Sequence, residues 1–379
     1  MTAPGRALSV EVCTDERAFA ELAGEWERLY RACPSATPFQ SHAWLHSWWL
    51  SYGRPGRLRL VLVRRSGELV AAAPLMREHR PLPALVPIGG AITDFCDVLV
   101  DGTAATEGAW ALAEALAELA RTALIDFREV RPGGAMERVY LCWRGPRHRT
   151  RDSVCLELPA VPVDELVGRL SSRHAQRVRN KVKRLVRLGV EWRVVRHDET
   201  EGALRRLLEL HRLQWQGRNM SAEHERPRFL EHLVRSVVPM ARSGQAAVTE
   251  FLLDGAVVAV NLNLLSGEMA GTYLYGFHPG LRERKVDVAA MLLHASTEHL
   301  ASGAEGDGRP HRVLSLLRGD EPYKYRWHPE SVTNQRFLLA RRRTLPLLAL
   351  AAGEAAARHR AKQVLRGNPG AADHRQDRS

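Results

Sequence analysis

One ten-residue stretch holds the densest set of side chains that can do chemistry. It reads, in order, Arg318-Gly319-Asp320-Glu321-Pro322-Tyr323-Lys324-Tyr325-Arg326-Trp327. The apolar run 311–317 before it predicts a buried strand, and Gly319 with Pro322 predicts a turn at the end of that strand. A strand-end turn with aromatic and cationic side chains can hold an anionic or carbonyl-bearing ligand. It is equally an ordinary turn with solvated cations, so both interpretations stay open.

A second set of cations lies on a helix predicted over 163–188. These cations recur at spacings of four, four and three residues and so share one face: Arg173, Arg177, Lys181 and Arg184. No acidic residue occurs between Glu165 and Glu191, so this face has no partner within the helix. It is either a solvated face or a surface that binds the phosphates of a donor or acceptor.

The elements that position these residues are arranged twice along the chain. The second half predicts a strand, two helices, a three-strand meander, a helix, a strand, a turn and a strand, and the first half repeats this order approximately. Two hairpin turns, Asp254-Gly255 and Ser266-Gly267, join the strands of the second meander. We therefore predict a domain at 1–160, a second at 161–343, and a helix with a disordered tail at 344–379.

Composition bounds the class of protein. The chain has 379 residues, 45% of them hydrophobic, which suits two globular domains and argues against disorder. The formal charge of +12 favours an anionic ligand such as CoA, a nucleic acid or a membrane surface, although an Arg-rich composition alone explains it equally well. The five cysteines are scattered and predict buried thiols in a reducing compartment.

Several motif classes are missing from the sequence. It contains no dinucleotide-binding glycine motif, P-loop, zinc-protease helix or nucleophile elbow, and its His residues lack metal spacing, so we expect no metal. The N-terminus has no apolar signal region, and no apolar run approaches the ~20 residues that span a bilayer. We therefore expect a cytoplasmic protein without a membrane span.

Six short segments, in this order, carry a family resemblance: PFQSHAWL at 38–45, SSR at 171–173, LHRLQWQGR at 210–218, LDGAVVA at 253–259, YGFHP at 275–279 and RGDEPYK at 318–324. Together they resemble the GNAT acyltransferase superfamily. The similar branch has tandem domains and includes FemAB-like aminoacyl transferases and the CelD-type proteins linked to bacterial polysaccharide synthesis.

The resemblance implies an α+β fold of two tandem GNAT-like domains, each a mixed, mostly antiparallel sheet flanked by helices. It implies an N-acyltransferase that moves an acetyl or longer acyl group from acyl-CoA to an amine of a small molecule or glycan, in polysaccharide or cell-envelope metabolism. Two alternatives remain: transfer from aminoacyl-tRNA, as in FemAB-like members, and an inactive scaffold that binds an anionic glycan precursor. The oligomeric state is open.

The resemblance also places the donor site. Relatives that use CoA bind its pyrophosphate on backbone N–H groups at the start of the helix after the meander, which corresponds to 281–290 here. Their loop usually carries glycines, whereas here it reads RERKVD at 282–287, without glycine. We predict that the phosphates are bound instead by side chains, and the predicted donor-binding residues are Arg282, Arg284, Lys285, Tyr275 and Arg318.

Acyl transfer to an amine needs a deprotonated amine, a polarised carbonyl and a means of holding the two together. The resemblance implies that a backbone N–H near 274–277 polarises the carbonyl. The predicted catalytic residues are Lys324 at the oxyanion, Tyr323 as the acid and Asp320 as the base, with Tyr325 and Glu321 as alternatives. The predicted substrate contacts are Arg177, Lys181 and Trp215. His211 shares an apolar helix side with Trp215, which is typical of a satisfied core histidine.

Overall fold

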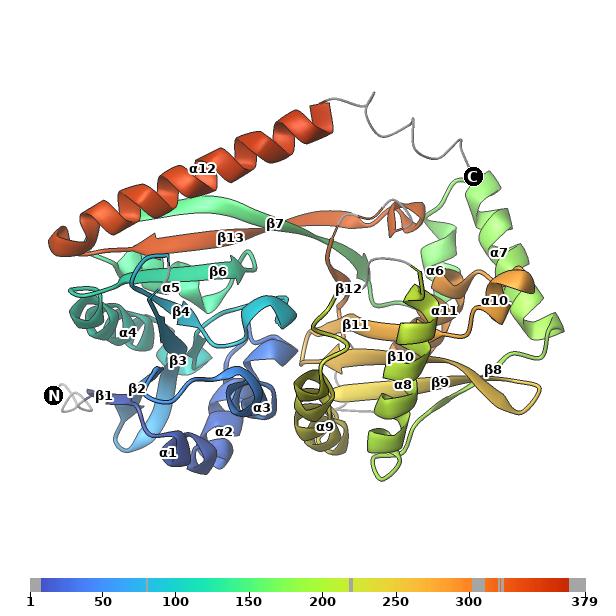
Figure 1. Cartoon of the computed structure of the whole chain (residues 1–379), viewed down its shortest axis with the longest axis horizontal. Helices are drawn as coiled ribbons and strands as arrows, with labels where there is room; N and C mark the ends of the chain where they lie inside the picture. The colour runs from blue at the N-terminus through green and yellow to red at the C-terminus, as the bar shows by residue number, and fades with distance from the viewer. Residues whose placement is uncertain are drawn as a thin grey trace, which may run out of the picture.

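One β-sheet extends through the computed structural model (Figure 1). The structure describes residues 8–79, 81–217, 221–301, 311–319, 321 and 324–367, without the side chains of 359 and 361–367. Within this part the sheet has 13 strands, and β5 (Leu99–Val100) pairs beside the main path with β3. The other strands follow in spatial order: β1 (Leu8–Cys13), β2 (Leu58–Arg65), β3 (Glu68–Glu78), β4 (Ala84–Pro87), β6 (Leu124–Val130), β13 (Glu330–Leu339), β7 (Arg147–Pro159), β12 (Val313–Arg318), β11 (Met269–Phe277), β10 (Ala256–Leu265), β9 (Ala246–Leu253) and β8 (Glu191–Val194).

Neighbouring strands are antiparallel except at two places, where β4 pairs with β6 and β11 pairs with β12. The two hairpin turns predicted in the second meander are present, because β9, β10 and β11 pair antiparallel in succession. The prediction of a mixed, mostly antiparallel α+β fold is confirmed. The parallel β11–β12 pair is the element that shapes the site.

Helices cover both faces of the sheet. Those of the first half are α1 (Glu16–Glu21), α2 (Ala23–Ala32), α3 (His42–Tyr52), α4 (Ala105–Leu119) and α5 (Ala135–Cys142). Those of the second half are α6 (Val163–Gly168), α7 (Ser172–Arg187), α8 (Thr200–Trp215), α9 (Pro227–Arg242), α10 (Gly280–Glu283) and α11 (Val288–Ala301), and α12 (Leu345–Gly367) lies along β7 and β13 (Figure 1). The prediction of one helix over 163–188 was wrong, because the chain leaves the helix after Gly168 and α7 restarts behind Ser171.

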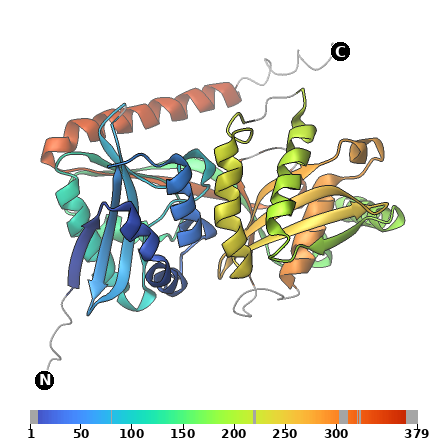
Figure 2. The ribbon, with the colours of Figure 1, turned by 60° about the horizontal axis from the view of Figure 1, so that its bottom comes forward.

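The second half has a separate core on each face of its sheet. Apolar side chains of α8 and α9 pack on one face of β9–β11, and Figure 2 shows these two helices side by side there. Apolar side chains of α6, α7 and α11 pack on the opposite face. This leaves α8 and α11 on either side of β11, which is the arrangement that encloses the site.

The two halves share strands. β13 comes from the end of the chain, yet it pairs with β6 of the first half and with β7, and β7 in turn pairs with β12. Buried Arg336 of β13 makes two 2.7 Å bonds to the carboxylate of Asp126 in β6. The domain limits at 160 and 343 stay a prediction. In the described part of the chain, no helix is long and apolar enough to cross a membrane.

Candidate active site

The parallel strands β11 and β12 pair over only three residues and then separate. The pairs are Met269 with Val313, Ala270 with Leu314 and Gly271 with Ser315. Beyond them β12 is irregular, since its register against β7 shifts before Arg318. Leu317 there has a φ of 56°, a left-handed conformation that a bulky residue rarely adopts. The two strands therefore diverge where β12 ends.

Gly271 makes room for this divergence. A Cβ atom on Gly271 would lie 2.8 Å from Cδ2 of Leu317, closer than van der Waals contact allows. Leu317 is buried, so its side chain packs directly against the backbone of β11 at the last paired position. A glycine at the branching point thus lets β12 turn while its side chain stays in the core.

A cavity of about 330 Å³ fills the space between the diverging strands. One wall is 272–275 of β11, the other is 316–318 of β12, and α11 and α8 close it from the two sides. The residues that line it include four predicted site residues: Trp215, Tyr275, Arg318 and Lys324. The indole N–H of Trp215 is buried and has no hydrogen-bond partner among the described residues. An unpaired donor in this position suits a ligand that carries an acceptor oxygen.

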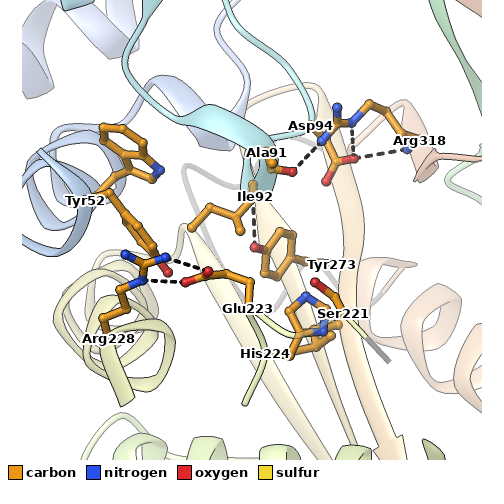
Figure 3. A pocket seen from close by; sticks show the side chains of 12 residues that line it. Tyr52, Ala91, Ile92, Asp94, Ser221, Glu223, His224, Arg228, Tyr273 and Arg318 are labelled. Carbon is orange, nitrogen blue, oxygen red and sulfur yellow. Dashed lines mark hydrogen bonds and ion pairs between the residues drawn. The ribbon is translucent and has the colours of Figure 1, made fainter. Parts of the chain in front are cut away.

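A second chamber of about 400 Å³ lies between the two halves of the chain (Figure 3). The first half contributes α3 and the loop 91–94, and the second half contributes 221–228 and β11. Five residues line both chambers, and we call this shared boundary the neck: Asp94, His224, Tyr273, Leu274 and Arg318. We call the chamber between the strands the inner chamber and the other the outer chamber. The site therefore offers two adjacent spaces, as a donor and an acceptor require.

Arg318 connects the end of β12 to the first half. Its Nε lies 2.9 Å from Oδ1 of Asp94, and its Nη2 donates to the carbonyl of Ala91 at 2.9 Å (Figure 3). Its Nη1 lies 3.4 Å from Oε1 of Glu129. The guanidinium was predicted to contact the donor. It borders both chambers, but its donors are engaged within the protein, so it fixes the wall of the neck.

Lys324 is buried at the inner chamber, and its ammonium group has several partners. Its Nζ donates to the carbonyl oxygens of Leu316 at 2.9 Å, Arg318 at 3.2 Å and Gly319 at 3.4 Å. It also lies 2.8 Å from the carboxylate of Glu321. The ammonium thus holds the irregular end of β12, and its role at an oxyanion stays a prediction. Asp320 and Tyr323, the predicted base and acid, lie outside the described residues.

The loop before α11 has the glycine-type conformation without a glycine. Lys285 has a φ of 54°, in the left-handed region that glycine adopts readily. Arg282 lies over the ring of Phe277 at 4.9 Å, and Arg284 bonds to Asp254 at 3.0 Å. These three predicted donor-binding side chains are exposed and close together in sequence, at the outer end of β11.

Asp287 occupies the N-terminus of α11. Its Oδ1 accepts the backbone N–H of Ala290 at 3.0 Å, and its Oδ2 pairs with Lys181 and lies 3.8 Å from Arg326. Burial alone would raise the pKa of this carboxyl, but the bonds from Lys181 and the Ala290 N–H hold the pKa below its usual value. Lys181, a predicted substrate contact, is therefore engaged at the donor loop, whereas Arg177 lies exposed one turn away on α7.

The main feature that the sequence did not predict is the pairing of His211, at the inner chamber, with His224, at the neck. His211 Nδ1 lies 2.7 Å from the carbonyl oxygen of Tyr275, and its Nε2 lies 3.2 Å from Nδ1 of His224. His211 is buried and bonded, as a core histidine is, and it also lines the inner chamber. The helical spacing of apolar residues in α8 places His211 on the buried side, but no sequence signal connects His211 with His224.

Comparison of the sequence and the structure with known proteins identifies the class of protein. Residues 172–325 match the model of the acetyltransferase (GNAT) domain family. This segment contains α7 to α11, the diverging strands and both histidines. The second half therefore holds a GNAT acetyltransferase domain, and the prediction of an acyltransferase enzyme is confirmed. No curated protein matches the chain in sequence.

Solved structures show that the likeness in fold extends over both halves. FemX has a TM-score of 0.59 at 13% identity, over 86% of this chain and 98% of that chain. The C-terminal domain of a putative lysylphosphatidylglycerol synthetase from Agrobacterium fabrum has a TM-score of 0.55 at 11% identity, over 89% of this chain and 96% of that domain. L-PGS from Bacillus licheniformis has a TM-score of 0.53 at 11% identity, over 86% of this chain and 94% of that chain. The likeness to CelD-type proteins stays a prediction. Among the described residues, no group of three or more His, Cys, Asp or Glu is arranged to hold a metal.

Proposed function

We propose that this protein transfers an acyl group from an acyl-CoA thioester to the amino group of a small molecule or glycan precursor. The observation that carries the proposal is the inner chamber, which lies where β11 and β12 separate inside the GNAT domain. Beyond Gly271, β11 no longer pairs with β12 among the described residues, and we infer that a backbone N–H group on this edge polarises the carbonyl. The acyl group enters the inner chamber and the amine enters the outer one.

The phosphates of the donor are bound by side chains around the donor loop. Six cationic side chains lie at the donor loop. Lys181 and Arg326 contact Asp287, Arg184 of α7 donates to the carbonyl of Arg284, and Arg282, Arg284 and Lys285 precede Asp287 in the loop. The first backbone N–H groups of α11 are partly used by the carboxylate of Asp287, which repels an anion. A pyrophosphate therefore pairs with the cationic side chains and competes with Asp287 for Lys181.

This competition predicts the effect of one substitution. Asp287→Asn keeps an N-cap for α11, since asparagine is as good a cap as aspartate, but removes the negative charge. We expect acetyl-CoA to bind about fivefold more tightly, because Lys181 and Arg326 become free for phosphate and about 1 kcal/mol of repulsion is lost. Isothermal titration measures the affinity, with Glu209→Gln on the exposed face of α8, outside the donor loop, as the control. Weaker binding to Asp287→Asn would show that Asp287 itself holds the donor.

The direct test of the proposed function is amine-dependent release of the CoA thiol. Purified protein is incubated with acetyl-CoA or a longer acyl-CoA and a panel of amines, and free thiol is measured with and without each amine. Release that requires both an amine and the protein supports the proposal. Thermal stabilisation by acyl-CoA without turnover on any amine favours the inactive scaffold instead.

A second candidate is transfer from aminoacyl-tRNA. It is favoured by the Asp287 carboxylate at the start of α11 and by Arg173 and Arg177, which are exposed on α7 without an ion-pair partner among the described residues. The fold shared with FemX agrees with it. Retention of charged tRNA at physiological salt, with an affinity that falls steeply with added salt and with Arg177→Glu, would support this donor over CoA.

A further inference from the structure

The histidine pair has a defined proton arrangement. A carbonyl oxygen can only accept, so His211 donates from Nδ1 to Tyr275, and the Nε2 of a neutral His211 is an acceptor. His224 must then donate from its Nδ1 across the 3.2 Å contact to His211. The remaining nitrogen of His224, Nε2, carries a lone pair. It has no protein partner among the described residues, and the residue lines both chambers.

We propose that Nε2 of His224 is the base that takes the proton from the attacking amine, a role that rests on the proposed acyl transfer. His224 lines both chambers, so it stands where an amine in the outer chamber meets a carbonyl in the inner one. Figure 3 shows it beside Ser221 and Tyr273 at the edge of the outer chamber. His211 acts as a positioning residue, because it fixes which nitrogen of His224 is bare.

The ring of His224 is held rigidly. It stacks on Phe229 of α9 at 4.7 Å and an interplanar angle of 23°, while His211 holds its other edge from α8. Two helices thus set the direction of Nε2, although His224 itself lies on the loop between them. Fixed geometry of this kind is what general-base catalysis requires.

Other polar and charged groups around the outer chamber already have partners. Asp94 is bound by Arg318, and Glu223 is bound by Arg228 through two bonds of 2.7 Å (Figure 3). The hydroxyl of Tyr273 donates to the carbonyl of Ile92 at 2.9 Å, and burial raises its pKa. Burial, and next the neighbouring His211, lower the pKa of His224 to about 4, and burial lowers the pKa of His211. Both rings are therefore neutral at pH 7, and His224 offers a free lone pair.

The step balances as follows. The lone pair of the amine nitrogen attacks the thioester carbon, the C–N bond forms, and the carbonyl π electrons move to the oxygen. The nitrogen, now positively charged and acidic, gives its proton to Nε2 of His224. The oxygen electrons re-form the carbonyl, the C–S bond breaks, and the departing thiolate of CoA takes the proton from the imidazolium. The products are an amide and free CoA, and neutral His224 is restored.

Chemical rescue tests this assignment. His224→Ala is expected to lower kcat of amine-dependent thiol release about 10²- to 10⁴-fold with little change in KM for acyl-CoA. Added imidazole should restore activity in proportion to its neutral fraction, which a merely structural role would not allow. The control is His46→Ala: burial also lowers the pKa of His46 to about 4, but His46 lies in neither chamber. That variant should keep wild-type kcat.

The outcomes separate the two claims. A wild type that acylates amines while His224→Ala keeps its kcat, or loses activity that imidazole does not restore, overturns the base assignment and leaves the proposed function standing. A wild type that transfers no acyl group from acyl-CoA or aminoacyl-tRNA overturns both. Nitrogen NMR of the wild type tests the protonation state without substrate. At pH 7, Nε2 of His224 should show the chemical shift of an unprotonated imidazole nitrogen. A protonated Nε2 would contradict the proposal.

Discussion

Gly276→Ala is expected to destabilise the protein by about 3 kcal/mol and to abolish acyl transfer. A Cβ atom at Gly276 would lie 2.3 Å from the backbone nitrogen of His211 and 2.5 Å from the carbonyl oxygen of Leu207. Both atoms belong to the backbone of α8, so no side-chain rotation relieves the clash and the helix must move away from β11. That movement breaks the bond between His211 and Tyr275 and deforms the inner chamber.

Urea unfolding and thiol release measure the two effects of this change. Gly202→Ala is the control, because Gly202 lies in α8, the helix that packs against Gly276, and a Cβ there meets only Arg206, at an ordinary 3.5 Å. We expect this control to be neutral or to stabilise α8 by up to about 1 kcal/mol. If Gly276→Ala unfolds at the same urea concentration as the wild type, the close packing of α8 on β11 is wrong.

The second large effect is expected for Lys324→Met, which keeps the apolar stem and removes the charge. Three carbonyl oxygens at the end of β12 lose their donor, and we expect a loss of about 3 kcal/mol in the free energy of unfolding. Two of these carbonyl groups flank Leu317 and hold its left-handed conformation. Without the ammonium group, the inner chamber should lose its shape and the protein should bind acyl-CoA more weakly.

Unfolding by urea and titration with acetyl-CoA measure this variant, with Lys183→Met on the exposed face of α7 as the control. Normal stability and normal acetyl-CoA affinity combined with a lost kcat would contradict the structural role. That result would instead favour Lys324 at the oxyanion.

Local sequence signals predicted much of the fold. The Asp254-Gly255 turn fixes its hairpin through residue types that the turn requires, since Asp254 and Gly255 have left-handed φ values of 53° and 77°. The Ser266-Gly267 turn also joins two paired strands, as predicted. The break between α6 and α7 was missed because no proline or glycine follows Gly168 until the helix has resumed. The pairing of β13 with β6 joins residues 210 positions apart at Arg336 and Asp126, and a single sequence carries no signal for it.

The candidate site was predicted in part. Arg318, Lys324, Tyr275 and Trp215 all line the inner chamber, because each lies at the end of a predicted element and those ends meet. The glycine-free donor loop was read as a departure from its relatives, yet Lys285 adopts the conformation that a glycine would supply. His224 could not be found, since it acquires its role only through a tertiary contact with His211.

The proposed function requires that the acyl donor occupies the space between β11 and β12. Ala289 lines this space from the first turn of α11 and is only half-buried, so Ala289→Trp fills the chamber without disrupting the core. Titration of the wild type and this variant with acetyl-CoA tests the claim, with Ala301→Trp at the exposed end of α11 as the control. We predict binding to the wild type and to Ala301→Trp, and at least tenfold weaker binding to Ala289→Trp. Equal affinity of all three proteins would contradict the claim.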